Sequence, residues 1–201
     1  MCVMKMIDIH RMSEAEKKEV VQEARLLEAL SHPNIVKFIE VYKTKKGKLC
    51  IIMDFADGGD LSQKVKDQRG RAFSEAQVLD WFTQICLGMK HIHDRKIIHR
   101  DLKGQNVFLT KKGIVQIGDL GIAKVLAQTA QKARTAVGTP YYLSPEIVQS
   151  QPYTLSTDVW SMGVMLYEMC ALKPPFDAPS LHMLSMKIVR GAYSPLSSSF
   201  S

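Results

Sequence analysis

The first third of the chain has a helical pattern of apolar residues. Ser13-Glu14-Ala15-Glu16 has the form of a capping box, which marks a helix start. Apolar residues then recur with helical spacing at Val20, Ala24, Leu27 and Leu30. The pattern predicts a helix over residues 13–30, and His32-Pro33-Asn34 is expected to end it.

Short apolar segments on both sides of this helix predict strands. Val3 to Ile7 is apolar except for Lys5, which is typical of a buried strand. A lysine there either extends its ammonium to solvent or has a buried anionic partner. Residues 35–42 and 48–55 flank the basic turn Lys45-Lys46-Gly47 and predict a hairpin.

Helical patterns dominate the chain beyond a polar break at residues 56–60. Helices are expected over residues 61–68, 74–93, 157–172 and 185–190, and the third is apolar enough to be a buried central helix. His91 and His93 are two positions apart on the second helix, so their side chains do not face each other as metal ligands would. The break therefore predicts a boundary between a sheet-rich region and a helical one.

Composition narrows the class of protein. The 201 residues are 46% hydrophobic and 23% charged, which is typical of a globular protein. No uninterrupted apolar run reaches about 18 residues, so neither a transmembrane helix nor a membrane partner is expected. The four cysteines are far apart, without a C-x-x-C pair, which favours a reduced intracellular protein over a zinc site.

The net charge of +7 permits anionic partners such as ATP, acidic proteins or nucleic acid. A solvated basic surface is the simpler interpretation. No motif supports a specific nucleic-acid site, so none is expected.

The residues His99 to Asn106 carry the strongest chemical signal. In this stretch Asp101 can orient a hydroxyl and accept its proton, and Lys103 can place a cation beside a transferring phosphoryl group. Asn106 offers a neutral oxygen to a metal ion. Asp119 follows after a segment with a hairpin pattern, which would return a second metal-binding carboxylate to the same place.

With these motifs the chain resembles the eukaryotic protein kinase family, and it is similar to the NIMA-related (Nek) serine/threonine kinases. H-R-D-L-K-G-Q-N at residues 99–106 matches the catalytic loop, and Lys103 is typical of serine/threonine rather than tyrosine kinases. Residues 118–124 and 138–146 carry the same resemblance, which covers nearly the whole chain.

The resemblance implies an α+β, bilobal protein kinase-like fold. Residues 1–55 would form a partial N-lobe with three strands and a regulatory helix, and residues 56–201 the hinge and a partial C-lobe. The glycine-rich strand pair of the N-lobe and the last helices of the C-lobe are not found in the sequence. The chain is therefore expected to be a kinase domain truncated at both ends.

The resemblance implies an ATP site formed by the predicted strands of residues 1–55 and by the polar break at residues 56–60. Lys5 would hold the α- and β-phosphates and pair with Glu23 on the long helix. The residues implied for adenosine are Met53 as gatekeeper, Asp54 to Ala56 as hinge, Asp60 for the ribose and Phe108 under the adenine.

A magnesium site is implied at Asn106 and Asp119, since Mg²⁺ prefers hard oxygen ligands shared with phosphate. Leu120 replaces the commoner phenylalanine of the D-F-G motif, and Gly121 completes it. Leu120 is apolar, so altered packing and inhibitor preference are expected rather than lost chemistry.

An activation segment is implied between Gly121 and Ser144. Phosphorylation of Thr135 is expected to switch activity on, with Arg100 and Lys124 receiving the phosphate. Thr129 and Thr139 are alternative sites, and a plain loop residue is the simplest alternative.

Three further residues have implied structural roles. His99 belongs to the catalytic loop, and Asp158 is expected to anchor the backbone of that loop. Glu146, in the segment that stands for A-P-E, is expected to be a buried charge without its usual arginine partner.

The implied function is a serine/threonine protein kinase that uses ATP and Mg²⁺ and acts on protein hydroxyls. Regulatory or scaffold proteins are further expected partners. A cytoplasmic location is implied, with cytoskeleton, centrosome or cilium as possible sites of association. The alternative is a truncated kinase-like interaction module with little or no turnover.

Overall fold

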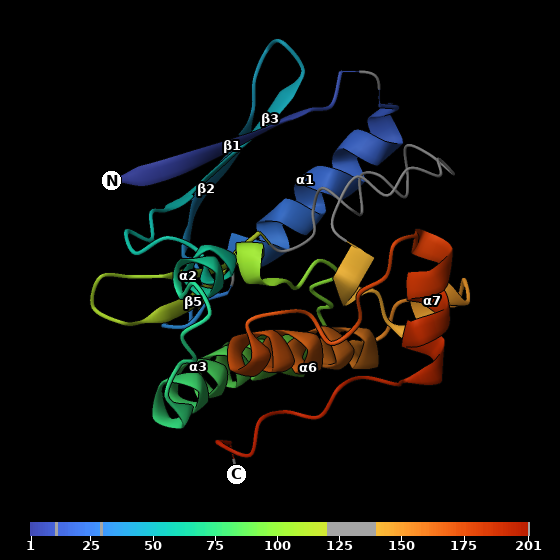
Figure 1. The fold of residues 1–201 in the computed structure, drawn as a ribbon. Coiled ribbons are helices and arrows are strands. Elements are labelled where there is room, and N and C mark those ends of the chain that lie inside the picture. The colour runs from blue at the N-terminus through green and yellow to red at the C-terminus, as the bar shows by residue number, and fades with distance from the viewer. Residues whose placement is uncertain (11, 29, 120–139, 201) are drawn as a thin grey trace.

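The computed structural model describes residues 1–10, 12–28, 30–119 and 140–200. Figure 1 shows a small sheet with one helix beside it at one end of the molecule, and a group of helices at the other. The α+β architecture predicted from the sequence is confirmed. The boundary at residues 55 and 56 stays a prediction.

The small sheet has three antiparallel strands in the order β1-β3-β2. They are β1 (Cys2–Asp8), β2 (Phe38–Lys43) and β3 (Lys48–Asp54), so the predicted hairpin is confirmed. The first strand of this hairpin, β2, begins at Phe38 rather than at residue 35, because Ile35 and Val36 pair with Ile117 instead. Ile35 forms a bridge with Ile117, and the Val36 amide donates to the Ile117 carbonyl at 2.8 Å.

The strand predicted at the start of the chain is present, but its predicted burial is wrong. Val3 is 40% exposed, Met4 50% and Met6 60%. β1 pairs with β3 alone, so it is an edge strand of the described sheet. A short apolar run has the same pattern in a buried strand and in an edge strand, which is why the sequence did not separate them.

Helix α1 (Glu14–Glu28) confirms the helix predicted from the capping box. The Ser13 amide donates to Glu16 Oε2 at 2.7 Å, and the Glu16 amide donates to Ser13 Oγ at 3.3 Å. Val20 and Ala24 are buried on the side that faces the core. These two reciprocal hydrogen bonds fix where the helix begins.

The helical region contains all four predicted helices. They are α2 (Leu61–Asp67), α3 (Glu75–Asp94), α6 (Leu155–Ala171) and α7 (Leu181–Arg190), with short turns η1 (Gly104–Asn106), η2 (Pro140–Tyr142) and α5 (Pro145–Val148) between them. α7 begins at Leu181 rather than Ser185, because the Ser180 hydroxyl caps it by accepting from the Met183 amide at 3.2 Å. No helix in the described ranges is long and apolar enough to span a membrane.

Helix α6 lies at the centre of the helical region, beside α3 (Figure 1). Met165 and Met169 are almost fully buried, which confirms a central helix, although Val159 is 57% exposed and does not belong to the core. One apolar cluster extends from Ile9 in the sheet-rich region to Met169 in α6. The two regions therefore share a core that holds the segment between them in place.

Candidate active site

A short antiparallel hairpin brings the two halves of the predicted site together. Its strands are β4 (Val107–Leu109) and β5 (Val115–Ile117). The Gly118 amide donates to the Asn106 carbonyl at 2.9 Å, so Asp119 leaves the hairpin next to Asn106. The return predicted from the sequence is confirmed.

Asp101, Lys103 and Asn106 form one polar cluster. Lys103 Nζ lies 2.9 Å from Asp101 Oδ2. Asn106 Nδ2 donates to the backbone carbonyl of Asp101 at 2.7 Å and to its Oδ2 at 3.0 Å. Both donors orient the Asp101 carboxylate through its Oδ2 atom.

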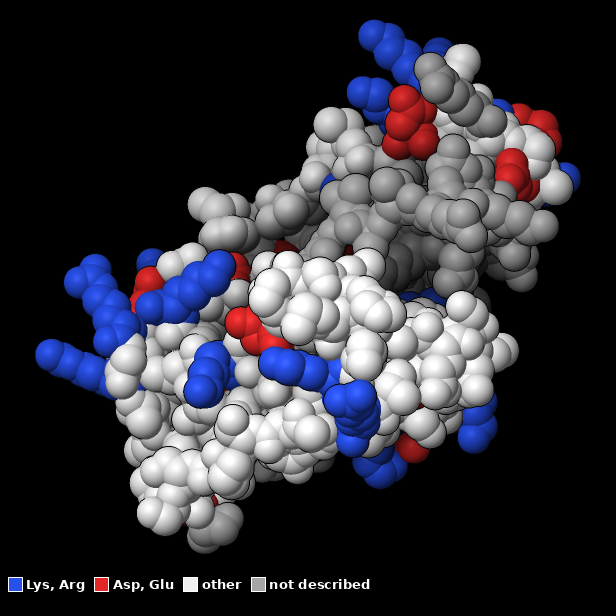
Figure 2. Space-filling view, turned by 45° about the vertical axis from the view of Figure 1, so that its right-hand side comes forward, with Lys and Arg blue, Asp and Glu red and all other residues white. Residues whose placement is uncertain are grey.

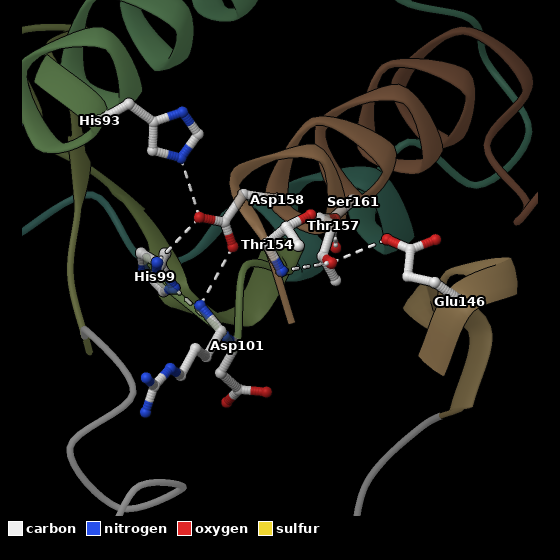
Figure 3. A network of polar contacts seen from close by, with 9 residues as sticks. His93, His99, Asp101, Glu146, Thr154, Thr157, Asp158 and Ser161 are labelled. Atoms are coloured by element: carbon white, nitrogen blue, oxygen red, sulfur yellow. Dashed lines mark hydrogen bonds and ion pairs between the residues drawn. The ribbon is translucent and has the colours of Figure 1, made fainter. Parts of the chain in front are cut away.

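Asp158, in the first turn of α6, holds the backbone of this cluster (Figure 3). Its Oδ2 accepts from the His99 amide at 2.8 Å, and its Oδ1 accepts from the Arg100 amide at 3.0 Å. The Asp158 side chain is 2% exposed. This is the contact that the family resemblance implies, and a charge-assisted pair of this kind is among the stronger hydrogen bonds in proteins.

The side chain of His99, the first residue of the catalytic loop, is fully buried, and burial lowers its pKa. Its Nε2 lies 3.1 Å from the Gly118 carbonyl, and its Nδ1 lies 3.3 Å from the Asp101 amide. A neutral ring with its proton on Nε2 satisfies both contacts, since Nε2 donates and Nδ1 accepts. The ring therefore connects the loop to the segment that carries Asp119.

Arg100 and Asp119 both have left-handed backbone, with φ of 67° and 53°. Such a conformation costs on the order of 1–3 kcal/mol for a residue other than glycine. The Arg100 conformation is held by the hydrogen bond from its amide to Asp158. Left-handed backbone thus occurs within the catalytic loop, at Arg100, and directly after the hairpin, at Asp119.

Lys5, the residue predicted to bind the ATP phosphates, contacts Asp119. Lys5 Nζ, from the middle of β1, forms an ion pair with Asp119 Oδ1, and the two side chains are 28% and 37% exposed. The anionic partner of Lys5 is therefore partly rather than fully buried. Glu23 lies in α1, but its side chain is outside the described residues, so the Lys5–Glu23 pair stays a prediction.

The residues predicted for adenosine follow the end of the sheet. Met53 is partly buried in β3, Asp54 ends that strand, and Ala56 is partly buried after it. Asp60 also has a structural role, because its Oδ1 caps α2 by accepting from the Gln63 amide at 2.9 Å.

Phe108 joins this group from β4. Its backbone forms a bridge with Asp60, and an added Cβ on Gly118 would lie 2.8 Å from Phe108 Cε2. The ring therefore lies against Gly118, one residue before Asp119. The structure thus places the Phe108 backbone beside the ribose candidate Asp60 and the Phe108 ring beside Gly118.

Most residues of the predicted phosphorylation switch lie outside the described part of the chain. Leu120, Gly121, Lys124, Thr135 and the alternative sites Thr129 and Thr139 lie outside the described residues. Arg100 is described, and its amide is bound to Asp158.

Glu146 differs from the prediction of an unpaired buried charge. It is partly buried, and its Oε1 accepts from the Thr157 hydroxyl at 2.7 Å (Figure 3). Burial raises the pKa of Glu146, but hydrogen bonds, chiefly from Thr157, outweigh this and leave the pKa below its ordinary value. A hydroxyl next to Asp158 thus supplies a partner that the sequence pattern did not reveal.

Sequence reasoning missed two further contacts of the catalytic loop. His93 Nε2 lies 2.9 Å from Asp158 Oδ2. The Tyr142 hydroxyl accepts from the Gly104 amide at 3.3 Å and donates to Glu168 Oε2. A signal for the second existed, because Glu168 is a carboxylate inside the apolar run of α6 and such a group needs a donor.

The oxygen atoms available at the site are of the chemical type that binds a magnesium ion. Asn106 directs its Nδ2 to Asp101, which leaves its Oδ1 for another partner, and Asp119 already attracts the ammonium of Lys5. One amide oxygen and one carboxylate are hard ligands of the kind that Mg²⁺ shares with phosphate.

Known proteins that resemble the chain are kinases. Residues 1–196 match the protein kinase domain family. The chain is 50% identical over 199 residues to the serine/threonine-protein kinase Nek1 of Mus musculus, covering 99% of this chain and 16% of that protein. It is 51% identical over 201 residues to the serine/threonine-protein kinase Nek5 of Homo sapiens, covering 100% and 28%.

A third relative, the serine/threonine-protein kinase Nek4 of Mus musculus, is 44% identical over 194 residues, or 96% of this chain and 24% of that protein. The chain thus spans less than a third of the length of these relatives. A protein kinase domain implies ATP binding and typically a divalent metal ion. The anchored catalytic loop and these matches together show that the chain belongs to the protein kinase family and is related to the Nek serine/threonine kinases.

Proposed function

We propose that the chain transfers the γ-phosphate of ATP to serine or threonine hydroxyls of protein substrates. The observation that carries the proposal is the Asp101 carboxylate, oriented by Lys103 and Asn106 on a loop that Asp158 anchors. This arrangement places a proton acceptor and a cation within one hydrogen bond of each other. Phosphoryl transfer needs both, since catalysis rests on positioning and on charge stabilisation.

Asp101 orients the substrate hydroxyl and accepts its proton as that oxygen bonds to the γ-phosphorus. The bond from the γ-phosphorus to its bridging oxygen breaks, and ADP leaves with that electron pair. Lys103, held 2.9 Å from Asp101, stabilises the negative charge on the transferring group. The neutral ring of His99 keeps the backbone of Asp101 in place throughout.

ATP would be bound by residues from both regions. Lys5 and its partner Glu23 would hold the phosphates, with Asp54 to Ala56 along the adenine edge, Met53 behind it, Phe108 beneath it and Asp60 at the ribose. Asn106 and Asp119 would hold Mg²⁺, which when bound neutralises phosphate charge. Lys5 contacts Asp119, so the phosphate and metal residues are adjacent.

Regulation and location form the less direct part of the proposal. Phosphorylation of Thr135, with Arg100 and Lys124 receiving the phosphate, would switch activity on. Regulatory or scaffold proteins and a cytoplasmic location, including cytoskeleton, centrosome or cilium, are proposed from the family. The non-catalytic interaction module is not favoured, because relatives that are 50% and 51% identical to the chain are named as kinases.

Transfer of labelled phosphate from ATP to a generic basic protein tests the proposal. We expect Asp101→Asn to lower the rate by about a hundredfold or more, the usual contribution of a positioned general base. Asp94→Asn, an exposed substitution on α3, is the matched control and should leave the rate unchanged. Equal incorporation by the parent chain and Asp101→Asn would refute the enzyme assignment.

A further inference from the structure

A groove in the helical region lies away from the catalytic loop. It has a volume of about 870 Å³ and runs between α2, α3 and the turn that joins β4 to β5. Figure 1 shows this hairpin beside α2 and above α3. None of the catalytic or ATP-binding residues proposed above lines it.

The walls of the groove are tied together by hydrogen bonds. Gln84 Oε1 on α3 accepts from the Val115 amide of β5 at 2.8 Å, and the Asp57 carboxylate accepts from the Lys111 amide at 2.8 Å. An added Cβ on Gly58 would lie 2.7 Å from the Leu109 carbonyl oxygen, so that wall is closely packed. The hollow is therefore preformed, which reduces the ordering cost of binding.

The floor of the groove is apolar and its rim is basic. Phe73 and Trp81 pack edge to face with ring centroids 5.1 Å apart, and Ile114 is 39% exposed beside them. Lys64, Lys111 and Lys112 line the rim against the single carboxylate of Asp80.

The basic rim is only partly balanced by nearby acids. The hydrogen bond from the Lys111 amide and the charges of Lys111 and Lys112 lower the pKa of Asp57, so Asp57 and Asp80 offset part of the rim charge. None of the three rim lysines forms an ion pair in the part of the chain that the structure describes. Figure 2 shows Lys and Arg side chains on the lower part of the face that it draws, with acidic side chains among them. The groove thus combines an excess of positive charge at its rim with a small apolar floor, the complement of an apolar side chain flanked by acids.

We propose that this groove docks an extended acidic segment of a partner protein, in which aspartate or glutamate flanks an apolar residue. The apolar residue covers Phe73, Trp81 and Ile114, and the acids meet the rim lysines. Gln68 and Gln77 line the groove with side-chain amides that form no hydrogen bond within the described residues, so they can bind a peptide backbone.

A nucleic acid fits the same groove less well. Its affinity depends on many phosphate contacts, and three lysines beside an aspartate offer few. The apolar floor would add nothing to a phosphate backbone, whereas it contributes buried area to a peptide side chain. The acidic peptide is therefore the occupant that uses every feature of the groove.

Fluorescence anisotropy of the 201-residue chain tests the proposal. The probe is a fluorescein-labelled peptide in which glutamate alternates with leucine, measured without ATP so that the result is independent of phosphate transfer. We expect the double substitution Lys111→Glu and Lys112→Glu to weaken binding roughly tenfold or more through like-charge repulsion. Ile114→Ser should weaken it several-fold by removing apolar contact.

Lys45→Glu with Lys46→Glu is the matched control, because it makes the same charge change on the exposed turn between β2 and β3. Circular dichroism establishes that every variant is folded. Absence of peptide binding by the parent chain would overturn the proposal. So would unchanged binding by the Lys111/Lys112 variant, an equal loss in the Lys45/Lys46 variant, or a single-stranded oligonucleotide that binds where the peptide does not.

Discussion

The catalytic loop has two sides that differ in burial. On the side of α6, Asp158 and His99 are 1% and 0% exposed and bind the loop backbone directly. On the side of the sheet, the Lys5 and Asp119 side chains are 28% and 37% exposed and bind each other. The first side fixes where the loop lies, and the second is more open, on the side of the proposed ATP site.

This difference in burial implies a difference in energy. Hydrogen bonds to a charged group contribute about 1.5–3 kcal/mol each when they are removed from water. An ion pair near the surface contributes about 0–1 kcal/mol, because solvent screens it. Substitutions on the α6 side should therefore change the free energy of unfolding, whereas those on the sheet side should change function first.

The largest effect is expected for Asp158→Ala. Two backbone amides and His93 lose their acceptor in a site without solvent, which should lower the free energy of unfolding by about 3–5 kcal/mol. Urea denaturation followed by circular dichroism measures this change. Asp94→Ala, an exposed acid on α3, is the control and should leave the midpoint unchanged. A parent-like midpoint for Asp158→Ala would mean that the anchor does not stabilise the fold.

Tyr142→Phe should have the next largest effect. The Gly104 amide loses its acceptor and Glu168 loses its donor, so the free energy of unfolding should fall by about 1–3 kcal/mol. Tyr193→Phe is the matched control, since Tyr193 is 59% exposed. The same urea titration compares the two variants, and equal midpoints would show that the hydroxyl of Tyr142 contributes nothing.

Local patterns predicted most of the fold. The capping box at Ser13 and the apolar spacing after it predicted the start of α1, and the helix predicted over residues 74–93 agrees with α3, which Ser74 caps. The exposure of β1 could not be predicted, because it depends on which strands pair beside it. Ile35 lies outside the strand predicted for it because it pairs with Ile117, and a partner so far along the chain cannot be predicted from a local pattern.

The candidate site was predictable in its residues, and in its contacts only where the family resemblance implied them, as for Asp158 and the loop backbone. Asp101, Asn106 and Asp119 follow from motif spacing, and the hairpin between them follows from its apolar pattern. Asp158 in α6 binds the loop, and His93 in α3 binds Asp158. Which residues of two helices face each other depends on how the helices pack, so local sequence patterns do not reveal it. His93 beside Asp158, and Thr157 beside Glu146, are therefore visible only in three dimensions.

A smaller effect is expected from pH, through His99. Burial holds the pKa of His99 below its ordinary value of 6.5, so the folded chain keeps the ring neutral where the unfolded chain protonates it. Above about pH 6.5 the ring is neutral in both states and contributes no slope. Below it, the unfolded state binds more protons, so stability should fall by up to about 1.4 kcal/mol per pH unit.

Urea titrations between pH 7.5 and 5.5 would reveal this slope. His99→Gln removes the titrating ring, so its curve should be flatter than that of the parent chain, whatever its absolute stability. His182→Gln, an exposed substitution on α7, should keep the parental slope. A slope that survives His99→Gln unchanged would assign the acid sensitivity to other groups.

Lys5→Met should have the smallest effect on stability and separates the two sides most clearly. The pair with Asp119 is partly exposed, so its loss should change the free energy of unfolding by less than about 1 kcal/mol. Phosphate transfer should nevertheless fall steeply, because the proposed cation at the ATP phosphates is gone. Lys48→Met, at the exposed start of β3, is the control for both measurements. A Lys5→Met chain that unfolds as readily as Asp158→Ala would mean that the sheet side also holds the fold together. A chain that keeps parental transfer would mean that Lys5 serves only to position Asp119.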